Sequence, residues 1–267
     1  MIKLIDDIKL LEPLCRAEPY FGCLFNSAAV SFFEDPEFLS IWVEVDEHEN
    51  ACSFLNAGTD SVMMFSPGGL PGFEMILFVT NLLSGGTIKH IECDENCYAV
   101  LKNLFDFEVE EAVQMFAENR IDMPKTDFKI KTFENFDDGW NVTKTLFEKE
   151  DNFAKDYWKL KMVRGVLKKQ TTLFTLYKDK AVSTACIRGR TENAGAITSV
   201  VTLSEHRNRG YASYLTTLCT NMLIDEHRTP WLVPANQKVQ KMYEKLGYKA
   251  AKKYYYLYNI KEKEDKK

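Results

Sequence analysis

The sequence predicts an α+β protein made of two similar halves, each a mixed, mostly antiparallel sheet flanked by helices. Short β-rich runs alternate with apolar stretches of helical spacing along the whole chain, which is the pattern of sheet and helix layers. The second half reads as strand, two helices, three strands, helix, strand, helix and strand. Because the end of this order also occurs in the first half, the pattern indicates an internal duplication.

An offset of 141 residues relates the two halves without a gap. It aligns Gly69 with Gly210 and a set of apolar positions: Leu77 with Leu218, Leu82 with Leu223, Leu101 with Met242, and Phe107 with Tyr248. We favour duplication over a coincidence of generic amphipathic spacing. Across the same offset, the Arg-Asn-Arg of residues 207–209 becomes Ser-Pro-Gly at 66–68, so the first half has lost these charges.

The first half is expected to begin with two packing helices within residues 3–33, separated by Pro19. Three short strands in a meander should follow, and then alternating helices and strands. The predicted strands are 41–45, 51–55, 61–65, 87–92 and 108–116, and the predicted helices are 73–83 and 95–104.

The second half is expected to begin after Pro124, which lies between a finished strand and a new one. Its predicted strands are 128–133, 171–177, 181–188, 197–203, 229–233 and 254–258, and its predicted helices are 138–148, 153–167, 211–224 and 236–246. The predicted domains are therefore residues 1–124 and 125–260, followed by a charged tail over 261–267 that is expected to be disordered.

Charge is divided unevenly between the halves. Residues 1–125 carry 7 Lys and Arg against 22 Asp and Glu, a net charge of −15, and the remainder carries +10. No Lys or Arg occurs between Arg16 and Lys89. A phosphate-rich ligand is therefore expected on the second half. The acidic whole-chain pI of about 5.6 and the interleaved acids argue against a nucleic-acid binder.

We expect a cytoplasmic protein without a membrane partner, since acids occur at the very start and no run of ~18 apolar residues occurs anywhere. The seven cysteines are scattered and form no Cys-x-x-Cys pair, which favours reduced thiols. Cys93 and Cys97, near His90, could be metal ligands. Because a second pair is missing, we favour a structural role for them and predict no metal.

A candidate anion site lies where the strand 197–203 meets the helix 211–224. Between them stands Glu-His-Arg-Asn-Arg-Gly, so Gly210 precedes the helix N-terminus. The unpaired N–H groups of a first helical turn and the positive end of the helix dipole favour an anion, and glycine allows close approach. Arg207 and Arg209 add positive charge. Taken alone, this stretch would also suit a basic turn that is exposed to solvent and binds no ligand.

A second stretch, Asn-Gln-Lys-Val-Gln-Lys-Met-Tyr-Glu-Lys-Leu-Gly-Tyr at 236–248, forms an amphipathic helix that ends at Gly247. Together the two stretches resemble the GCN5-related N-acetyltransferase (GNAT) superfamily over roughly the last 140 residues. The motif Arg/Gln-x-x-Gly-x-Gly/Ala is matched by Arg207, Gly210 and Ala212. The later pattern Asn-x-x-Ala-x-x-x-Tyr-Glu-Lys-Leu-Gly-Phe is matched by Asn236 and residues 243–247, with mild departures at Val239 and Tyr248.

The resemblance implies an N-acetyltransferase that moves an acetyl group from acetyl-CoA directly to a primary amine of a small molecule or peptide in a ternary complex. It also implies that the strand before the loop pairs with the pantetheine arm, and that the loop holds the pyrophosphate. The residues so assigned are Val200, Val201, Thr202, Arg207, Asn208, Arg209, Gly210, Tyr211, Ala212, Ser213 and Asn236. Helix N-capping explains Asn236 almost equally well.

For the chemistry, the resemblance assigns Tyr243 as the acid that protonates the departing thiolate, with packing as the alternative role. The motifs do not identify the general base. Glu192 is our candidate, with Glu205, His206 and a chain of water molecules as alternatives. The first half is expected to be a degenerate GNAT-like domain that binds no cofactor, because its loop 66–72 has no cation.

A non-catalytic acyl-CoA-binding protein is the alternative function, since a fold can keep a cofactor site without its chemistry. Retention of Tyr243 favours the enzyme. The sequence identifies neither the acceptor amine, nor the preferred acyl chain, nor the oligomeric state.

Overall fold

The computed structural model describes residues 1–32, 40–58, 60–124, 128–133, 146, 169–178 and 180–259, and the statements below refer to these residues. The helices predicted at 138–148 and 153–167 lie outside the described residues except for Leu146, and the tail 261–267 lies wholly outside them.

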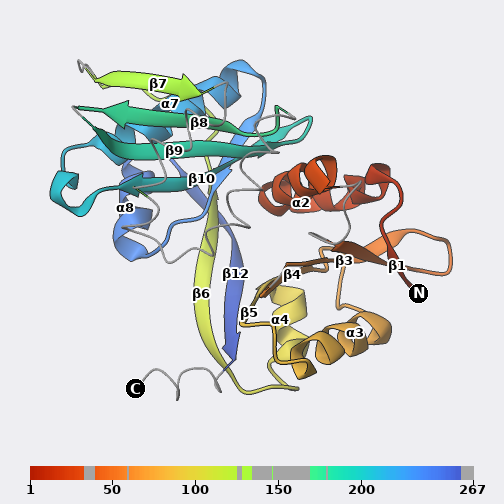
Figure 1. The fold of residues 1–267 in the computed structure, drawn as a ribbon. Coiled ribbons are helices and arrows are strands. Elements are labelled where there is room, and N and C mark those ends of the chain that lie inside the picture. The colour runs from red at the N-terminus through yellow and green to blue at the C-terminus, as the bar shows by residue number, and fades with distance from the viewer. Residues whose placement is uncertain are drawn as a thin grey trace. The chain divides into compact units, whose positions relative to one another are not determined.

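The chain folds into two compact units (Figure 1). The first unit is Met1–Glu18, Phe32–Gln114 and Ala251–Lys267, and the second is Pro19–Ser31 and Met115–Ala250. The chain therefore passes more than once between them. The two units are defined by contacts in space and not by continuous stretches of sequence. They therefore do not test the domain limits at 124 and 260, which remain predictions from the sequence.

The first unit is a mixed sheet with two helices, residues 73–84 and 95–101, packed on one face. Its elements are β1 (Ile2–Leu4), η1 (Ile8–Leu11), α1 (Glu12–Ala17), β2 (Ser40–Val45), β3 (Ala51–Ala57), β4 (Ser61–Phe65), α3 (Phe73–Ser84), β5 (His90–Asp94), α4 (Glu95–Leu101), most of β6 (Phe107–Phe116) and most of β12 (Lys249–Asn259). Neighbouring strands from β1 to β4 pair antiparallel, β4 pairs parallel with β5, and β5 pairs antiparallel with β12.

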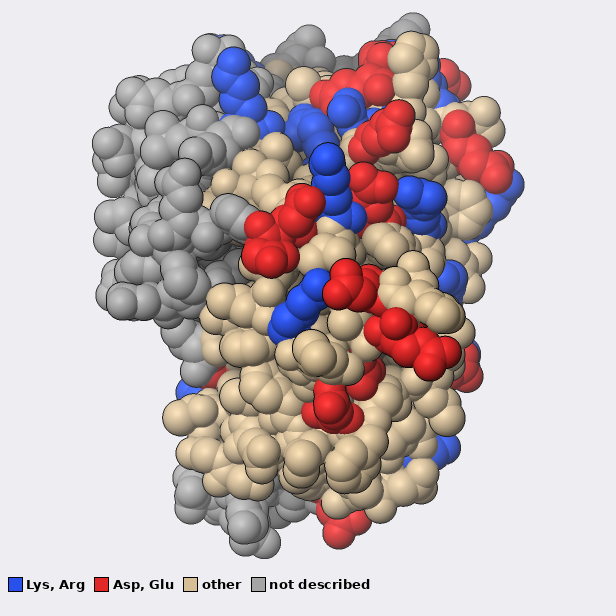
Figure 2. All heavy atoms as spheres, turned by 90° about the vertical axis from the view of Figure 1, so that its right-hand side faces the viewer, with Lys and Arg blue, Asp and Glu red and all other residues tan. Residues whose placement is uncertain are grey.

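The core of the first unit lies between this sheet and α3 and α4. Buried side chains of alternate strand residues, such as Leu55, Met64 and Ile91, pack against Met75 and Val79 of α3. Residues that face this core recur at every second position in the strands and at every third or fourth position in the helix. The lower part of the face in Figure 2 carries few charged side chains.

One part of the sequence prediction for this unit is wrong. The expected first helix does not start at residue 3, because Ile2–Leu4 forms an edge strand that pairs antiparallel with β2 from Glu44 to Trp42. The Asp7 side chain accepts a hydrogen bond from the Lys9 amide and caps η1, which places the first helical turn after Asp7. The fifth strand also starts later than predicted, at His90.

The second unit is a mostly antiparallel sheet with one parallel pair. Its elements are α2 (Pro19–Phe32), β7 (Lys129–Phe133), β8 (Thr172–Tyr177), β9 (Ala181–Arg190), β10 (Ala194–Thr202), η2 (Ser204–His206), α7 (Tyr211–Asp225), β11 (Thr229–Leu232) and α8 (Gln237–Lys245). The strand order is β11-β10-β9-β8-β7, with the end of β6 beside β11. Helix α7 packs on β9, β10 and β11.

Glycine allows two of these helices to approach the sheet closely. A Cβ on Gly195 of β10 would lie 2.2 Å from Leu223 Cδ2 of α7, and one on Gly189 of β9 would lie 2.3 Å from the Cys23 carbonyl oxygen of α2. No real Cβ comes so close to another heavy atom, so a larger residue at Gly195 would displace the Leu223 side chain, and one at Gly189 would displace the backbone of α2.

In the first unit, the N-terminus of α3 is bound by a buried carboxylate. Glu44 of β2 is 8% exposed, and its Oε2 accepts hydrogen bonds from the Gly72 amide (2.8 Å) and the Ser53 hydroxyl (2.6 Å). Gly72 is the N-cap residue of α3 and has no side chain of its own to cap the helix. Glu44 thus supplies the negative charge that a helix N-terminus favours.

We therefore expect Glu44→Ala to lower the free energy of unfolding by about 2–4 kcal/mol, because two buried donors lose a charged acceptor. Urea unfolding of the parent and the variant measures this difference. Glu12→Ala is a matched control, since Glu12 is exposed and pairs with Arg16 one turn away. It should change stability by less than about 0.5 kcal/mol. Equal effects of the two substitutions would contradict the role of Glu44.

Candidate functional site

Strand β10 continues well beyond its parallel neighbour. It pairs with β11 from Ala194 opposite Thr229 to Ile197 opposite Leu232, and then runs on to Thr202. The five residues 198–202 have no partner on the β11 side among the described strands and are half-buried. At ~3.3 Å per residue, this leaves about 16 Å of strand edge with main-chain groups directed away from the ladder. Val200, Val201 and Thr202 lie on this segment.

A β-bulge marks the start of the open segment. The register of β10 against β9 shifts between Thr198 and Val201, and Ser199 has a φ of 54°. A bulge removes main-chain groups from the ladder and redirects them. Beyond it, the Ser183 hydroxyl donates to the Val201 carbonyl at 2.9 Å and fixes the strand again.

This bulge was not expected from the sequence. Its only signal is the polar pair Thr198 and Ser199 within an apolar strand, because no glycine or asparagine stands at the position of positive φ.

The loop after β10 leads to an open helix N-terminus. Gly210 is the N-cap residue of α7, has a φ of 80° and makes no side-chain cap. A Cβ built on it would meet nothing within 4 Å. The first N–H groups of α7 have no partner within the helix and stand at the positive end of its dipole. This terminus fits a phosphate group.

Arginine side chains border this terminus. Arg207 Nε donates to the Thr202 carbonyl at 3.1 Å, which links the guanidinium to the end of β10. Arg209 is exposed, and Asn208 between the two has a φ of 61°. The loop that leads to the N-cap residue Gly210 thus carries two cations.

The first turn of α7 is anchored by an aromatic contact. Tyr211 is 3% exposed and meets Phe128 edge to face at 4.9 Å, while Phe128 also meets Tyr214 at 5.3 Å. Ala212 and Ser213 are half-buried and small. The anchored side chains leave the other side of the turn open for a ligand.

Tyr243 of α8 lies in the core of the second unit. It is 3% exposed, and its ring centroid lies 5.8 Å from that of Tyr248. Burial raises the pKa of Tyr243 far above its usual value, an effect that the neighbouring Thr216 side chain opposes. The phenol therefore stays protonated at neutral pH and can act as a proton donor but not as a phenolate base.

Asn236 is the N-cap residue of α8, and its side-chain oxygen accepts a hydrogen bond from the Val239 amide at 3.1 Å. Asn236 therefore caps the helix, which was the alternative to a role in cofactor binding. A contact of Asn236 with a cofactor stays a prediction.

The three candidates for the general base lie in different places. Glu192 is exposed in the turn before β10, so the length of the strand, roughly 30 Å, separates it from the loop. Glu205 is exposed beside Lys180 (3.4 Å). Its pKa is lowered by a hydrogen bond from its own backbone amide and by Lys180, which weakens it as a base. His206 in η2 has a buried Nδ1 without a hydrogen-bond partner among the described residues. The structure does not bring Glu192 together with Tyr243 and the loop.

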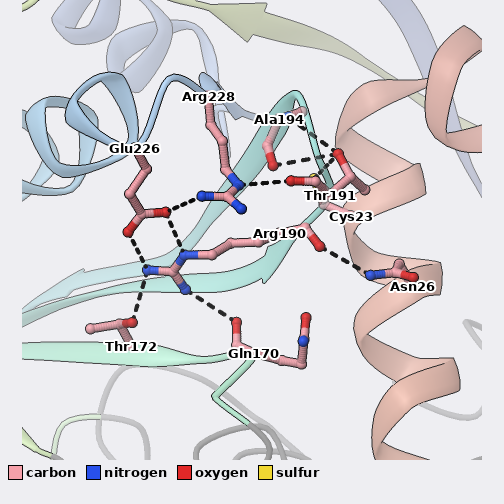
Figure 3. A network of polar contacts seen from close by, with 9 residues as sticks. All are labelled: Cys23, Asn26, Gln170, Thr172, Arg190, Thr191, Ala194, Glu226 and Arg228. Atoms are coloured by element: carbon pink, nitrogen blue, oxygen red, sulfur yellow. Dashed lines mark hydrogen bonds and ion pairs between the residues drawn. The ribbon is translucent and has the colours of Figure 1, made fainter.

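The opposite end of β10 is held by a network of two arginines and one glutamate (Figure 3). Glu226, which follows α7, binds Arg190 Nε at 2.9 Å and Arg228 Nη1 at 2.8 Å. Arg228 Nε also donates to the Thr191 carbonyl at 2.7 Å, and Arg190 Nη2 donates to the Thr172 hydroxyl at 3.0 Å. The end of α7 is thereby fixed to β8 and to the turn before β10.

The corresponding region of the first unit is closed by its own side chains. Strand β4 ends one residue after its last pair with β5, and the Ser66 amide then donates to Asp94 Oδ2 at 2.8 Å. Asn96 Nδ2 donates to the Ser66 carbonyl at 2.7 Å, and Glu44 binds the Gly72 amide. Burial raises the pKa of Asp94, and hydrogen bonds from Cys97 and Ser66 oppose the rise. Carboxylates thus lie where a phosphate would have to bind.

Two further expectations concern absences. In the part of the chain that the structure describes, no three His, Cys, Asp or Glu side chains gather as metal ligands would. No helix among the described residues is long and apolar enough to cross a membrane. The absence of a metal and the absence of a membrane partner therefore remain predictions from the sequence.

Comparison with known proteins gives a family match over part of the chain. Residues 173–257 match the family model described as FR47-like protein. No curated protein matches the chain in sequence.

Several solved structures share the fold over nearly the whole chain. A GCN5-related N-acetyltransferase-like protein from Streptococcus suis has a TM-score of 0.59 at 16% identity and covers 94% of this chain and 99% of its own. A tandem GNAT protein from the clavulanic acid biosynthesis pathway has a TM-score of 0.61 at 9% identity, covering 96% and 98%. A GCN5-related N-acetyltransferase from Sphaerobacter thermophilus has a TM-score of 0.60 at 11% identity, covering 96% and 94%.

These identities are too low to carry an activity, so the likeness concerns the fold. The predicted resemblance and fold class are confirmed: the chain has the fold of tandem GNAT proteins, and its C-terminal region matches the GNAT-related FR47-like family.

Proposed function

We propose that the chain is an N-acetyltransferase that moves an acetyl group from acetyl-CoA to a primary amine of a small molecule or peptide. The single observation that supports this most is the second unit's open strand edge leading to an open helix N-terminus. The edge offers main-chain groups over residues 198–202, and the terminus offers N–H groups beside Arg207 and Arg209. A ligand with an amide-bearing arm and a pyrophosphate suits both.

The loop and first turn would hold the pyrophosphate. Asn208 to Gly210 provide a backbone that approaches the anion closely, and Tyr211 to Ser213 provide the N–H groups of the first turn. Residues 200–202 would pair with the pantetheine amides through their main chain. Position dominates the rate of such a transfer, because two reactants held in line need no further ordering.

The chemistry is direct transfer in a ternary complex. The amine nitrogen forms a bond to the acetyl carbon, the bond from that carbon to sulfur breaks, and the thiolate takes a proton. Tyr243 is proposed to supply that proton, since its raised pKa keeps the phenol neutral. The amine also loses a proton. Glu192 lies far from the other site residues, so we assign this proton to solvent water.

A non-catalytic acyl-CoA-binding protein is the second candidate, since the full burial of Tyr243 also suits a packing role. Incubation with acetyl-CoA and a panel of amines, while free thiol is followed, separates the two. Thiol release that depends on the amine supports the enzyme, and binding without release supports the second candidate.

The loop assignment predicts that Gly210→Asp abolishes acetyl-CoA binding. The new carboxylate would stand beside the phosphate position and repel it, so affinity measured by calorimetry should fall at least about 100-fold. The parent should bind one acetyl-CoA per chain, because Glu44 and Asp94 fill the corresponding region of the first unit.

Gly86→Asp is the matched control for backbone strain. Gly86 also has a positive φ, of 72°, and open space around its Cβ, but it lies in the first unit. Gly195 would be unsuitable, because its Cβ would strike Leu223. Unchanged affinity of a folded Gly210→Asp variant would remove the loop assignment, and a stoichiometry of two would remove the closed first unit.

The acid role predicts that Tyr243→Phe lowers kcat about 100-fold or more while acetyl-CoA binding stays nearly unchanged, because only the proton donor is lost. Tyr248→Phe is the matched control, since Tyr248 is a second buried tyrosine whose hydroxyl lies 2.6 Å from Thr220 Oγ1. Single-turnover measurements report the chemical step. Equal losses in both variants would assign Tyr243 to packing.

A further inference from the structure

Two tyrosine–threonine pairs lie next to each other in the core of the second unit. Tyr243 of α8 neighbours Thr216 of α7, and Tyr248, which follows α8, neighbours Thr220 of α7. The two threonines are one helical turn apart and therefore share a face of α7. The ring centroids of the two tyrosines lie 5.8 Å apart. All four side chains are buried.

The pair of Thr220 and Tyr248 satisfies its own hydrogen bonds. Thr220 Oγ1 donates to the Thr216 carbonyl at 2.8 Å and lies 2.6 Å from the Tyr248 hydroxyl. A hydroxyl carries one hydrogen, so Tyr248 donates to Thr220 in this second bond. Both hydroxyls thus have the partners that burial demands, and the pair is explained by its contribution to structure.

The pair of Thr216 and Tyr243 is different. Thr216 is 0% exposed, yet its Oγ1 makes no hydrogen bond to any residue that the structure describes. It therefore meets neither the Tyr243 hydroxyl nor a carbonyl of the preceding turn in hydrogen-bond geometry. A buried hydroxyl without a partner costs free energy, and valine would fill the same space without that cost. The position of this hydroxyl beside the proposed acid calls for an explanation.

The chemistry proposed for Tyr243 creates a need for a hydrogen-bond donor. A phenol that gives its proton to a thiolate becomes a phenolate. The ordinary pKa of a phenol, ~10, already exceeds that of a thiol, ~8.5, so this transfer is uphill. Burial raises the pKa of Tyr243 further, and Cys219 adds to the rise, whereas the Thr216 side chain opposes it.

Of the two threonines on this face of α7, Thr216 is the one whose donor is not engaged. The hydroxyl hydrogen of Thr220 is held by the Thr216 carbonyl. The hydroxyl hydrogen of Thr216 is held by no described residue, so it can rotate toward an oxygen that becomes charged. A hydrogen bond to a charged oxygen is stronger than one to a neutral phenol.

We propose that Thr216 is a positioning residue for Tyr243, whose hydroxyl turns to donate to the phenol oxygen as the phenol proton passes to the thiolate of CoA. The O–H bond of Tyr243 breaks and an S–H bond forms, while the O–H bond of Thr216 stays intact. The proton that the amine released to water then restores the phenol. This inference rests on the proposed function, because it requires Tyr243 to act as the acid.

The test compares single-turnover thiol release by the parent, Thr216→Val and Thr216→Ser. Thr216→Val should lower kcat about tenfold and leave the KM for acetyl-CoA unchanged, because one hydrogen bond to a charged oxygen is lost in the chemical step. Thr216→Ser should retain most of kcat, because it keeps the hydroxyl. An unchanged kcat of Thr216→Val, beside an active parent, would overturn the proposal.

Thr217→Val is the matched control. Thr217 is equally buried and its Oγ1 also lacks a partner among the described residues, but it points about 100° away from Thr216 around the helix. It should leave kcat unchanged, and a loss equal to that of Thr216→Val would assign the effect to helix packing. In a Tyr243→Phe background, Thr216→Val should cause no further loss, since no phenolate forms. A further tenfold loss there would also overturn the proposal.

Urea unfolding gives a readout that does not depend on activity. Because the Thr216 hydroxyl has no partner to lose, Thr216→Val should unfold at the same urea concentration as the parent or at a higher one. A lower midpoint would show that the hydroxyl serves the structure, which would overturn the proposal. Failure of the proposed function is seen separately: a parent without amine-dependent thiol release removes the acid role of Tyr243 and this inference with it.

Discussion

Unpaired main-chain groups at the end of a strand and at the start of a helix are the constraint on which both units depend. Such groups need a partner, whether a side chain, water or a ligand. In the first unit, Glu44 and Asp94 supply carboxylates to the amides of Gly72 and Ser66. In the second unit, Gly210 supplies nothing. The same arrangement of elements is therefore closed in one unit and left available to an anion in the other.

The open end of β10 depends on the fixed end. Glu226 binds Arg190 and Arg228, which ties the end of α7 to the sheet, and Gly195 allows Leu223 to pack directly on β10. Strand β10 and helix α7 are thereby held together at the end that lies far from Gly210. Strand β10 can therefore extend past its last pair with β11 to Thr202 while its other end stays packed on α7.

Local signals were predicted well from the sequence, and contacts between distant segments were not. The N-cap Asn236 and the positive φ of Gly247 followed from side-chain chemistry within one helix. The edge strand Ile2–Leu4 and the bulge at Ser199 depend on partner strands, so periodicity could not reveal them. The role of Glu44 was equally hidden, because 28 residues separate it from the Gly72 amide that it binds. The order of elements and the fold class needed only local patterns.

The strong negative charge of the first half has two separate structural consequences. Glu44 and Asp94 are buried and accept hydrogen bonds from the backbone, whereas Glu92 pairs across the strands with Tyr256, and Glu110 accepts a hydrogen bond from the Tyr258 hydroxyl. The first consequence accompanies the absence of arginine at 66–68. A buried carboxylate is tolerated when it receives several hydrogen bonds, and the backbone amides at the strand end and at the helix start donate them here. Once those amides are used, a phosphate has no donors left to bind. The carboxylates that bind these amides therefore also close the first unit to an anion.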